Sequence, residues 1–236
     1  MLTFPEKEKY TVEDLRLLVT LLRSPEGCPW DREQTHESIR RNLIEEAYEC
    51  AEAIDEHDQE HLIEELGDVL LQVLFHADME QDAGNFTLED VTDGTCRKLL
   101  RRHPHVFAPE PNPGVEATLA TWEAVKRTER KDSSLTGALE AVSKTLPALW
   151  RADKLQNKAA KAGFPVEDTA DIAAALRAAA DQLEQTGPDS AMVGPLLFSM
   201  VRLAKISEID PEDALNEENS AFIQRFKTYE SESINK

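Results

Sequence analysis

The chain of 236 residues contains 46 acidic and 26 basic side chains, which give it a formal net charge of −20 at pH 7. This charge argues against nucleic acid and anionic membranes as partners, because both bind basic surfaces. The composition, with 41% hydrophobic and 31% charged residues, is typical of a globular protein, and no run approaches the roughly 20 apolar residues of a membrane helix. The N-terminus lacks a signal-peptide pattern and the three cysteines form no disulfide framework, so we expect a cytoplasmic protein.

Apolar residues recur at helical spacing along most of the chain, and no segment shows the alternation of a strand. Thr11 and Asp14 have the spacing of a capping box at the start of the first helix. Helices are expected at residues 11–22, 37–57, 59–80, 87–102, 115–130, 139–162 (with a break near Pro147), 172–185, 191–207 and 211–229. The sequence therefore predicts an all-α protein, in which a polar linker at residues 131–137 separates domains at 1–130 and 138–236.

Two acidic clusters lie on either side of the short connector near residue 57. Glu46 and Glu49 precede the connector, Glu65 and Asp68 follow it, and each pair is spaced i, i+3 on one side of its helix. The connector permits only an antiparallel hairpin, and with a rise of about 1.5 Å per residue both pairs lie on the order of 15 Å from the turn. Like charges on one helix face are destabilising without a cation. The four carboxylates therefore predict a divalent-metal site, and an oxygen-only ligand set favours Mg²⁺ or Mn²⁺ over Zn²⁺.

Other interpretations of these acids stay open at this point. A run of acidic residues is most often a solvated helix face. A di-iron carboxylate bundle pairs Glu with a Glu-x-x-His motif, and neither acidic cluster contains that motif. The matched positions of the two pairs across a hairpin favour the magnesium-type site over both alternatives.

A small basic group stands out in this acidic chain. Lys98, Arg101 and Arg102 lie near the end of a predicted helix, where they can bind a triphosphate or simply stabilise the helix C-terminus. Trp30 is a candidate for stacking on a base, with a packing role as its alternative. Cys50 shares the apolar face of its helix and is expected in the core.

Part of the acidic hairpin recurs later in the chain. Residues 65–77 and 192–204 share the apolar pattern, and Gly67 corresponds to Gly194. Met192 stands where Glu65 does, and Pro195 stands where Asp68 does. We interpret this as a duplicated helical unit whose second copy lacks the acids, with chance similarity between amphipathic helices as the alternative.

Several motifs occur in order: CPWDREQTH from Cys28, EExxE from Glu45, ExxD from Glu65 and RRHPHVF from Arg101. Two later stretches, WExxK from Trp122 and LQNKAAKAGF from residue 155, continue the series. Together they resemble the MazG family of all-α nucleoside triphosphate pyrophosphohydrolases over almost the whole chain. The resemblance is to the longer, two-copy members, and it implies tandem helical bundles that are completed by dimerisation.

The resemblance also implies the roles of individual residues. Glu46, Glu49, Glu65 and Asp68 would bind Mg²⁺, with Mn²⁺ as a substitute, and Glu45 would be a further acid of the site. Glu45 or Glu49 would position or deprotonate the attacking water. It also implies Lys98, Arg101 and Arg102 as substrate-binding residues, and Trp30 joins them as a candidate from the sequence alone.

The expected reaction splits a nucleoside triphosphate at the α–β linkage into a nucleoside monophosphate and pyrophosphate, in a homodimer that clears unwanted nucleotides. One alternative is a non-catalytic nucleotide-sensing or scaffold protein that retains the binding fold, since the second copy lacks the acids. Another is an enzyme with a narrower substrate range, such as dUTP, dCTP or an oxidised nucleotide.

Overall fold

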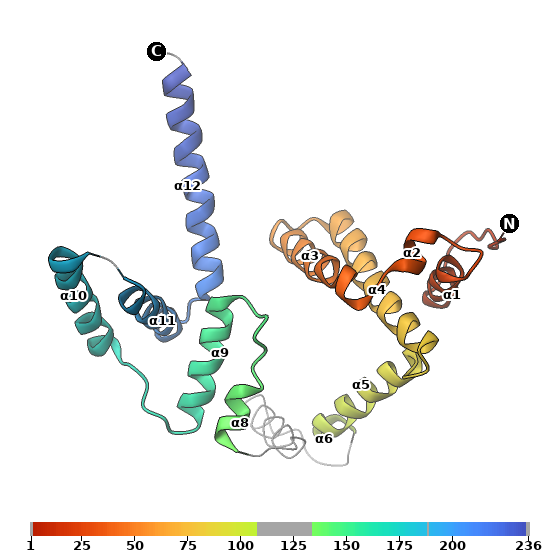
Figure 1. The fold of residues 1–236 in the computed structure, drawn as a ribbon, viewed down its shortest axis with the longest axis horizontal. Helices are drawn as coiled ribbons and strands as arrows, with labels where there is room; N and C mark the ends of the chain where they lie inside the picture. Colours follow the sequence, from red (N-terminus) through yellow and green to blue (C-terminus); the bar gives the residue numbers. More distant parts are fainter. Residues whose placement is uncertain (1, 108–133, 188, 235–236) are drawn as a thin grey trace. The chain divides into compact units, whose positions relative to one another are not determined.

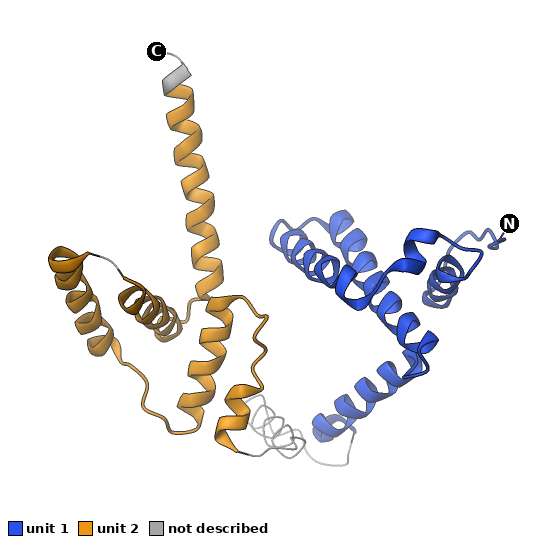
Figure 2. Ribbon diagram, viewed as in Figure 1, with its two compact units in different colours: residues 1–125 blue, residues 126–236 orange. Residues whose placement is uncertain are grey.

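All secondary-structure elements in the described part of the computed structural model are α-helices (Figure 1). The structure describes residues 2–107, 134–187 and 189–234. The chain divides into two compact units, residues 1–125 and 126–236 (Figure 2). The predicted all-α class is confirmed. The predicted helix at 115–130 and the first part of the predicted linker at 131–137 lie outside the described residues, and the rest of that linker already enters a helix at Leu135.

Unit 1 consists of a long helical hairpin with shorter helices attached to it. Its helices are α1 (Val12–Arg23), α2 (Pro29–Glu33), α3 (His36–Asp55), α4 (Gln59–Asp82), α5 (Leu88–Arg102) and α6 (Pro104–Phe107). Polar side chains accept hydrogen bonds from the free N–H groups at the start of four of these helices: Thr11, Thr35, Asp58 and Thr87. These caps explain why the helices begin within a few residues of the predicted positions.

Helices α3 and α4 form the predicted antiparallel hairpin (Figure 1). His57 in the turn adopts a left-handed conformation, with φ of 57°. At the open end, Nδ1 of His36 lies 2.7 Å from Nδ1 of His76, and Nε2 of His36 lies 2.6 Å from Oε1 of Glu80. The ring planes differ by only 10° and the centroids are 4.9 Å apart, so the two imidazoles meet edge to edge through these nitrogens. The hairpin is therefore closed at both ends.

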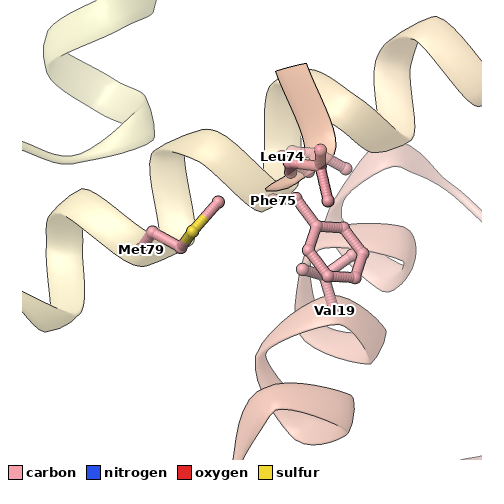
Figure 3. Packing of buried hydrophobic residues seen from close by; sticks show 5 residues of the cluster. Val19, Leu74, Phe75 and Met79 are labelled. Atoms are coloured by element: carbon pink, nitrogen blue, oxygen red, sulfur yellow. The ribbon is translucent and has the colours of Figure 1, made fainter. Parts of the chain in front are cut away.

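The hydrophobic core of unit 1 joins α1 to the hairpin. Val19 of α1 packs with Ile39 of α3 and with Leu74, Phe75 and Met79 of α4 (Figure 3). Val19 is 1% exposed and Leu74 is 2% exposed. This packing holds the middle and the open end of the hairpin and leaves the acidic residues nearer the turn.

A buried ion pair also anchors α1 on α4. Nε of Arg23 donates to Asp78 at 2.8 Å, and the two side chains are only 8% and 9% exposed. Arg23 also contacts Asp82 at 3.0 Å, and the hydroxyl of Thr20 donates to Asp78 at 2.6 Å. The carboxylate of Asp78 is thus held by two side chains of α1.

Replacing Arg23 with Met should destabilise unit 1 by about 3–5 kcal/mol, because Asp78 would be left buried without its cation. Hydrogen exchange of the α1 and α4 amides, followed by mass spectrometry, measures this loss locally. The matched control is Arg97→Met, which removes the exposed i, i+4 pair with Asp93 and should cost no more than about 0.5 kcal/mol. Equal protection of α1 in the two variants would contradict the prediction.

Unit 2 also consists of helices that pack against one another. Its helices are α8 (Leu135–Glu140), α9 (Ala148–Lys161), α10 (Thr169–Thr186), α11 (Ser190–Ile206) and α12 (Pro211–Ile234). The break predicted near Pro147 in the segment 139–162 is present, and it is wide, because α8 ends at Glu140 and α9 begins only after Pro147. Ile172 and Val201 are 1% exposed and mark the core. A largely apolar cavity of about 440 Å³ lies between α9, the loop after it and α11, and Pro195 is part of its lining.

No single helix among the described residues is long and apolar enough to cross a membrane. Helices α11 and α12 meet the length and composition criteria only when taken together, as a pair bent by 104°.

Candidate metal centre

The hairpin brings three of the predicted ligands together. Glu46 and Glu49 of α3 and Glu65 of α4 each present a carboxylate oxygen, and these oxygens all lie within 4.8 Å of one another. Asp68 lies outside this group of three but acts electrostatically on both Glu46 and Glu65. The acidic centre is defined here as these four residues.

The environment of this centre disfavours ionised carboxylates. Burial, followed by the charge of Asp68 and a hydrogen bond with Glu49, raises the pKa of Glu46 above its usual value of 4.5. Burial, followed by the charge of Glu49, raises the pKa of Glu65, while nearby His61 opposes the increase. Burial and the charges of Glu65 and Glu46 also raise the pKa of the Cys50 thiol. Such a centre either retains protons or binds a cation.

These pKa shifts predict a pH dependence for the metal-free protein. Because Glu46 and Glu65 bind protons more tightly in the folded chain, their stabilising contribution is complete below pH 4.5 and is lost as the pH rises through their raised values. In a chelating buffer, the melting temperature should therefore fall more steeply above pH 4.5 in the wild type than in a Glu46→Gln, Glu65→Gln double variant. Thermal unfolding at a series of pH values measures the difference. Parallel curves would show that the two acids are not responsible.

The residues present fit a bound divalent cation. Glu65 is 7% exposed, and its Oε2 atom is buried with no hydrogen-bond partner in the described part of the chain. An unpaired buried carboxylate oxygen is costly, so a ligand at this atom would remove a penalty. The donors are carboxylates alone, a set that suits a hard cation such as Mg²⁺, Mn²⁺ or Ca²⁺.

Glu45 lies beside the acidic centre and outside the group of three. Its carboxylate is 3.9 Å from Nε of Arg41, in a side chain that is 53% exposed. With Tyr48 and Glu49 it lines a shallow depression of about 340 Å³ on the surface of α3. Glu45 is thus accessible to solvent next to the candidate ligands.

The predicted substrate-binding residues are not brought to the acidic centre within one chain. Helix α5 leaves α4 at the end opposite the hairpin turn (Figure 1), and Lys98, Arg101 and Arg102 lie in its last turns. The strongest electrostatic influences on Glu46 and Glu65 come from other acids and His61, and none comes from these basic residues. Trp30 lies on α2, which packs on α1, and is 61% exposed.

One neighbour of the acidic centre was not predicted from the sequence. Nε2 of His61 lies 3.2 Å from Oε1 of Glu65, one helical turn further along α4. Their i, i+4 spacing is visible in the sequence, but a histidine near a turn carries no signal of its own until the hairpin is built.

Comparison with known proteins links this centre to a family. Residues 34–107, which contain all four acids, match the model of the MazG nucleotide pyrophosphohydrolase domain. A Thermotoga maritima protein named nucleoside triphosphate pyrophosphohydrolase/pyrophosphatase MazG is 41% identical over 223 residues, which are 92% of this chain and 85% of that protein. The nucleoside triphosphate pyrophosphohydrolase of Escherichia coli K12 is 38% identical over 93% of this chain and 87% of its own length.

A third relative, YabN of Bacillus subtilis, is 45% identical over 91% of this chain, although the match covers only 45% of YabN. Similarity at this level extends through both units, and the family model covers the acidic hairpin. The chain therefore belongs to the MazG family.

Proposed function

We propose that this protein hydrolyses nucleoside triphosphates at the α–β linkage and releases a nucleoside monophosphate and pyrophosphate, with Mg²⁺ as its cation and Mn²⁺ as a substitute. Family membership and the names of the Thermotoga maritima and Escherichia coli relatives support this reaction. The observation that carries the proposal is the approach of three carboxylate oxygens to within 4.8 Å, with a buried oxygen of Glu65 that has no hydrogen-bond partner among the described residues. A role in clearing unwanted nucleotides fits the reaction.

Each acid of the site has a role in this proposal. Glu46, Glu49, Glu65 and Asp68 hold the cation, which when bound neutralises the triphosphate and acidifies water. Glu45 or Glu49 orients the attacking water and accepts its proton, and the exposure of Glu45 lets that proton pass to solvent. Phosphoryl transfer depends mainly on positioning and charge stabilisation, which this set of side chains supplies.

The triphosphate also needs positive charge, and we propose that it comes from Lys98, Arg101 and Arg102. Arg guanidinium groups bind phosphate oxygens through paired donors. Because these residues are separated from the acids within one chain, they would come from α5 of a second subunit in a homodimer. The active site would then combine acids of one subunit with basic residues of the other.

Exposed apolar side chains near the site support the homodimer. On α4, close to the acids, Ile63 is 74% exposed and Leu66 is 55% exposed. On α5, next to the basic residues, Leu99 is 47% exposed and Leu100 is 52% exposed. Covering both faces would remove substantial apolar area from water, so association of the hairpin with the α5 helix of a second copy is favourable.

The reaction is tested by incubating the full chain with Mg²⁺ and a panel of NTPs and dNTPs, and by measuring pyrophosphate and orthophosphate separately. Pyrophosphate in equal amount to the monophosphate is expected, and Glu46→Ala should eliminate it while circular dichroism remains unchanged. Orthophosphate as the sole product would refute cleavage at the α–β linkage.

The same panel tests the second candidate, a nucleotide sensor or scaffold. The observation in its favour is Met192 and Pro195, which stand in the second copy where Glu65 and Asp68 stand in the first. Nucleotide binding without turnover of any nucleotide in the panel would favour the sensor over the hydrolase. Turnover confined to one nucleotide would instead identify a narrow-range enzyme.

A further inference from the structure

Glu65 is the most deeply buried member of the acidic centre, and its two carboxylate oxygens have different surroundings. Oε2 is buried and has no hydrogen-bond partner in the described residues. Oε1 lies 3.2 Å from Nε2 of His61. A carboxylate whose oxygens differ in this way has one atom already engaged by the protein and one atom left for a ligand.

His61 is itself held in a defined position. It lies in the first turn of α4, where the Asp58 side chain accepts hydrogen bonds from the backbone N–H groups of Glu60 at 3.0 Å and His61 at 3.1 Å. The cap fixes the backbone of His61, and the helix then places its imidazole over the residue four positions later. The side chain of His61 is 32% exposed, whereas that of Glu65 is 9% exposed.

A contribution to folding does not account for this contact. Partly exposed i, i+4 pairs on a helix contribute only about 0.3–0.5 kcal/mol. The other strong influences on Glu65 come from Glu49 and Asp68, which are acidic and repel it. Among the strongest charges that act on Glu65, His61 is thus the favourable one.

We propose that His61 is a positioning residue of the metal centre, which holds Oε1 of Glu65 and so keeps Oε2 available to a cation. The inference rests on the proposed metal-dependent function and extends it to a residue outside the ligand set. Polar neighbours that orient a ligand carboxylate in this way change metal affinity by about 10–100-fold when they are removed.

The test uses the full chain and Mn²⁺, whose free concentration is measured by electron paramagnetic resonance. His61→Leu should bind Mn²⁺ about 10–100-fold more weakly than the wild type. His61→Gln, whose amide also reaches one turn along the helix, should bind closer to the wild type than to the Leu variant. His57→Asn is the matched control, since it removes a histidine from the same turn and Asn tolerates the left-handed conformation there. It should bind Mn²⁺ as the wild type does.

Catalysis provides a second readout that a purely structural role would not give. In His61→Leu, raising the Mn²⁺ concentration should restore kcat to near the wild-type value, because the defect lies in cation affinity. Equal Mn²⁺ affinity in the wild type and His61→Leu, or a Gln variant no better than Leu, overturns the role of His61. Absence of Mn²⁺ binding in the wild type overturns the metal centre itself, so the two failures are distinct.

Discussion

Replacing Glu65 with Gln should abolish divalent-cation binding and lower the rate of pyrophosphate release by at least about 100-fold. Loss of a residue that only supports a metal ligand lowers activity by up to about 100-fold, and loss of a ligand itself should cost at least as much. Gln keeps the size of the side chain but removes the charge. Glu65 is the one carboxylate of the centre that is buried and has an oxygen without a hydrogen-bond partner in the part of the chain that the structure describes. Isothermal titration with Mg²⁺ measures the first effect, and a coupled pyrophosphate assay measures the second.

The change should leave the fold intact and should stabilise the metal-free protein at neutral pH. The wild-type carboxylate must ionise there against burial and the charge of Glu49, whereas Gln has nothing to ionise. Glu64→Gln is the matched control, because it removes one negative charge from the adjacent, exposed position. If Glu65→Gln binds Mg²⁺ as tightly as Glu64→Gln, Glu65 is not a ligand.

Mixing two inactive variants should restore activity if the site is shared between subunits. One variant carries Glu65→Gln, and the other carries Lys98→Met with Arg101→Met on α5. In a two-fold homodimer that pairs the acids of one chain with the α5 helix of the other, half of the dimers formed after subunit exchange contain one wild-type site. The mixture should then reach about a quarter of the wild-type rate, starting from two inactive proteins.

The control for this mixture uses two variants from the same side of the site, Glu65→Gln and Glu46→Gln. Both changes affect the hairpin, so every site in the mixed dimers keeps a defective set of acids and no activity should return. Native mass spectrometry of the same samples, with one of the two variants labelled with ¹⁵N, confirms that subunits have exchanged. No recovery in the first mixture, with exchange established, would place the basic residues and the acids of a site on the same chain.

The arrangement of the acids was largely predictable from local rules. The i, i+3 spacing of Glu46 with Glu49 depends only on the helical repeat, and Thr35 and Asp58 start the two helices where short polar residues cap well. A connector of a few residues then brings Glu65 back to the level of the first pair. Helical spacing, capping and turn length depend on residues close together in the chain, so the sequence is sufficient to predict them.

The apolar pattern was less informative about packing partners. Periodicity places Leu74 and Ile63 alike on apolar faces of α4, yet Leu74 is 2% exposed and Ile63 is 74% exposed. Apolar residues with a period of 3.6 indicate that one face of the helix packs against another element. The period does not indicate whether that element is a helix of the same chain or of a second copy. The proposed dimer follows from this difference, which appears only when the chain is folded.

By itself, the sequence determined the all-α class, the hairpin and the identity of the acids, because capping, helical periodicity and turn length act over a few residues. Only the tertiary structure decided that Glu65 is buried with one oxygen unpartnered among the described residues, that His61 contacts it, and that α5 leaves α4 away from the acids. Burial depends on what α3 and α4 exclude from water together, and the direction of α5 depends on packing after the turn at Gly84. Both are set by contacts between different helices, which the pattern within one helix does not encode.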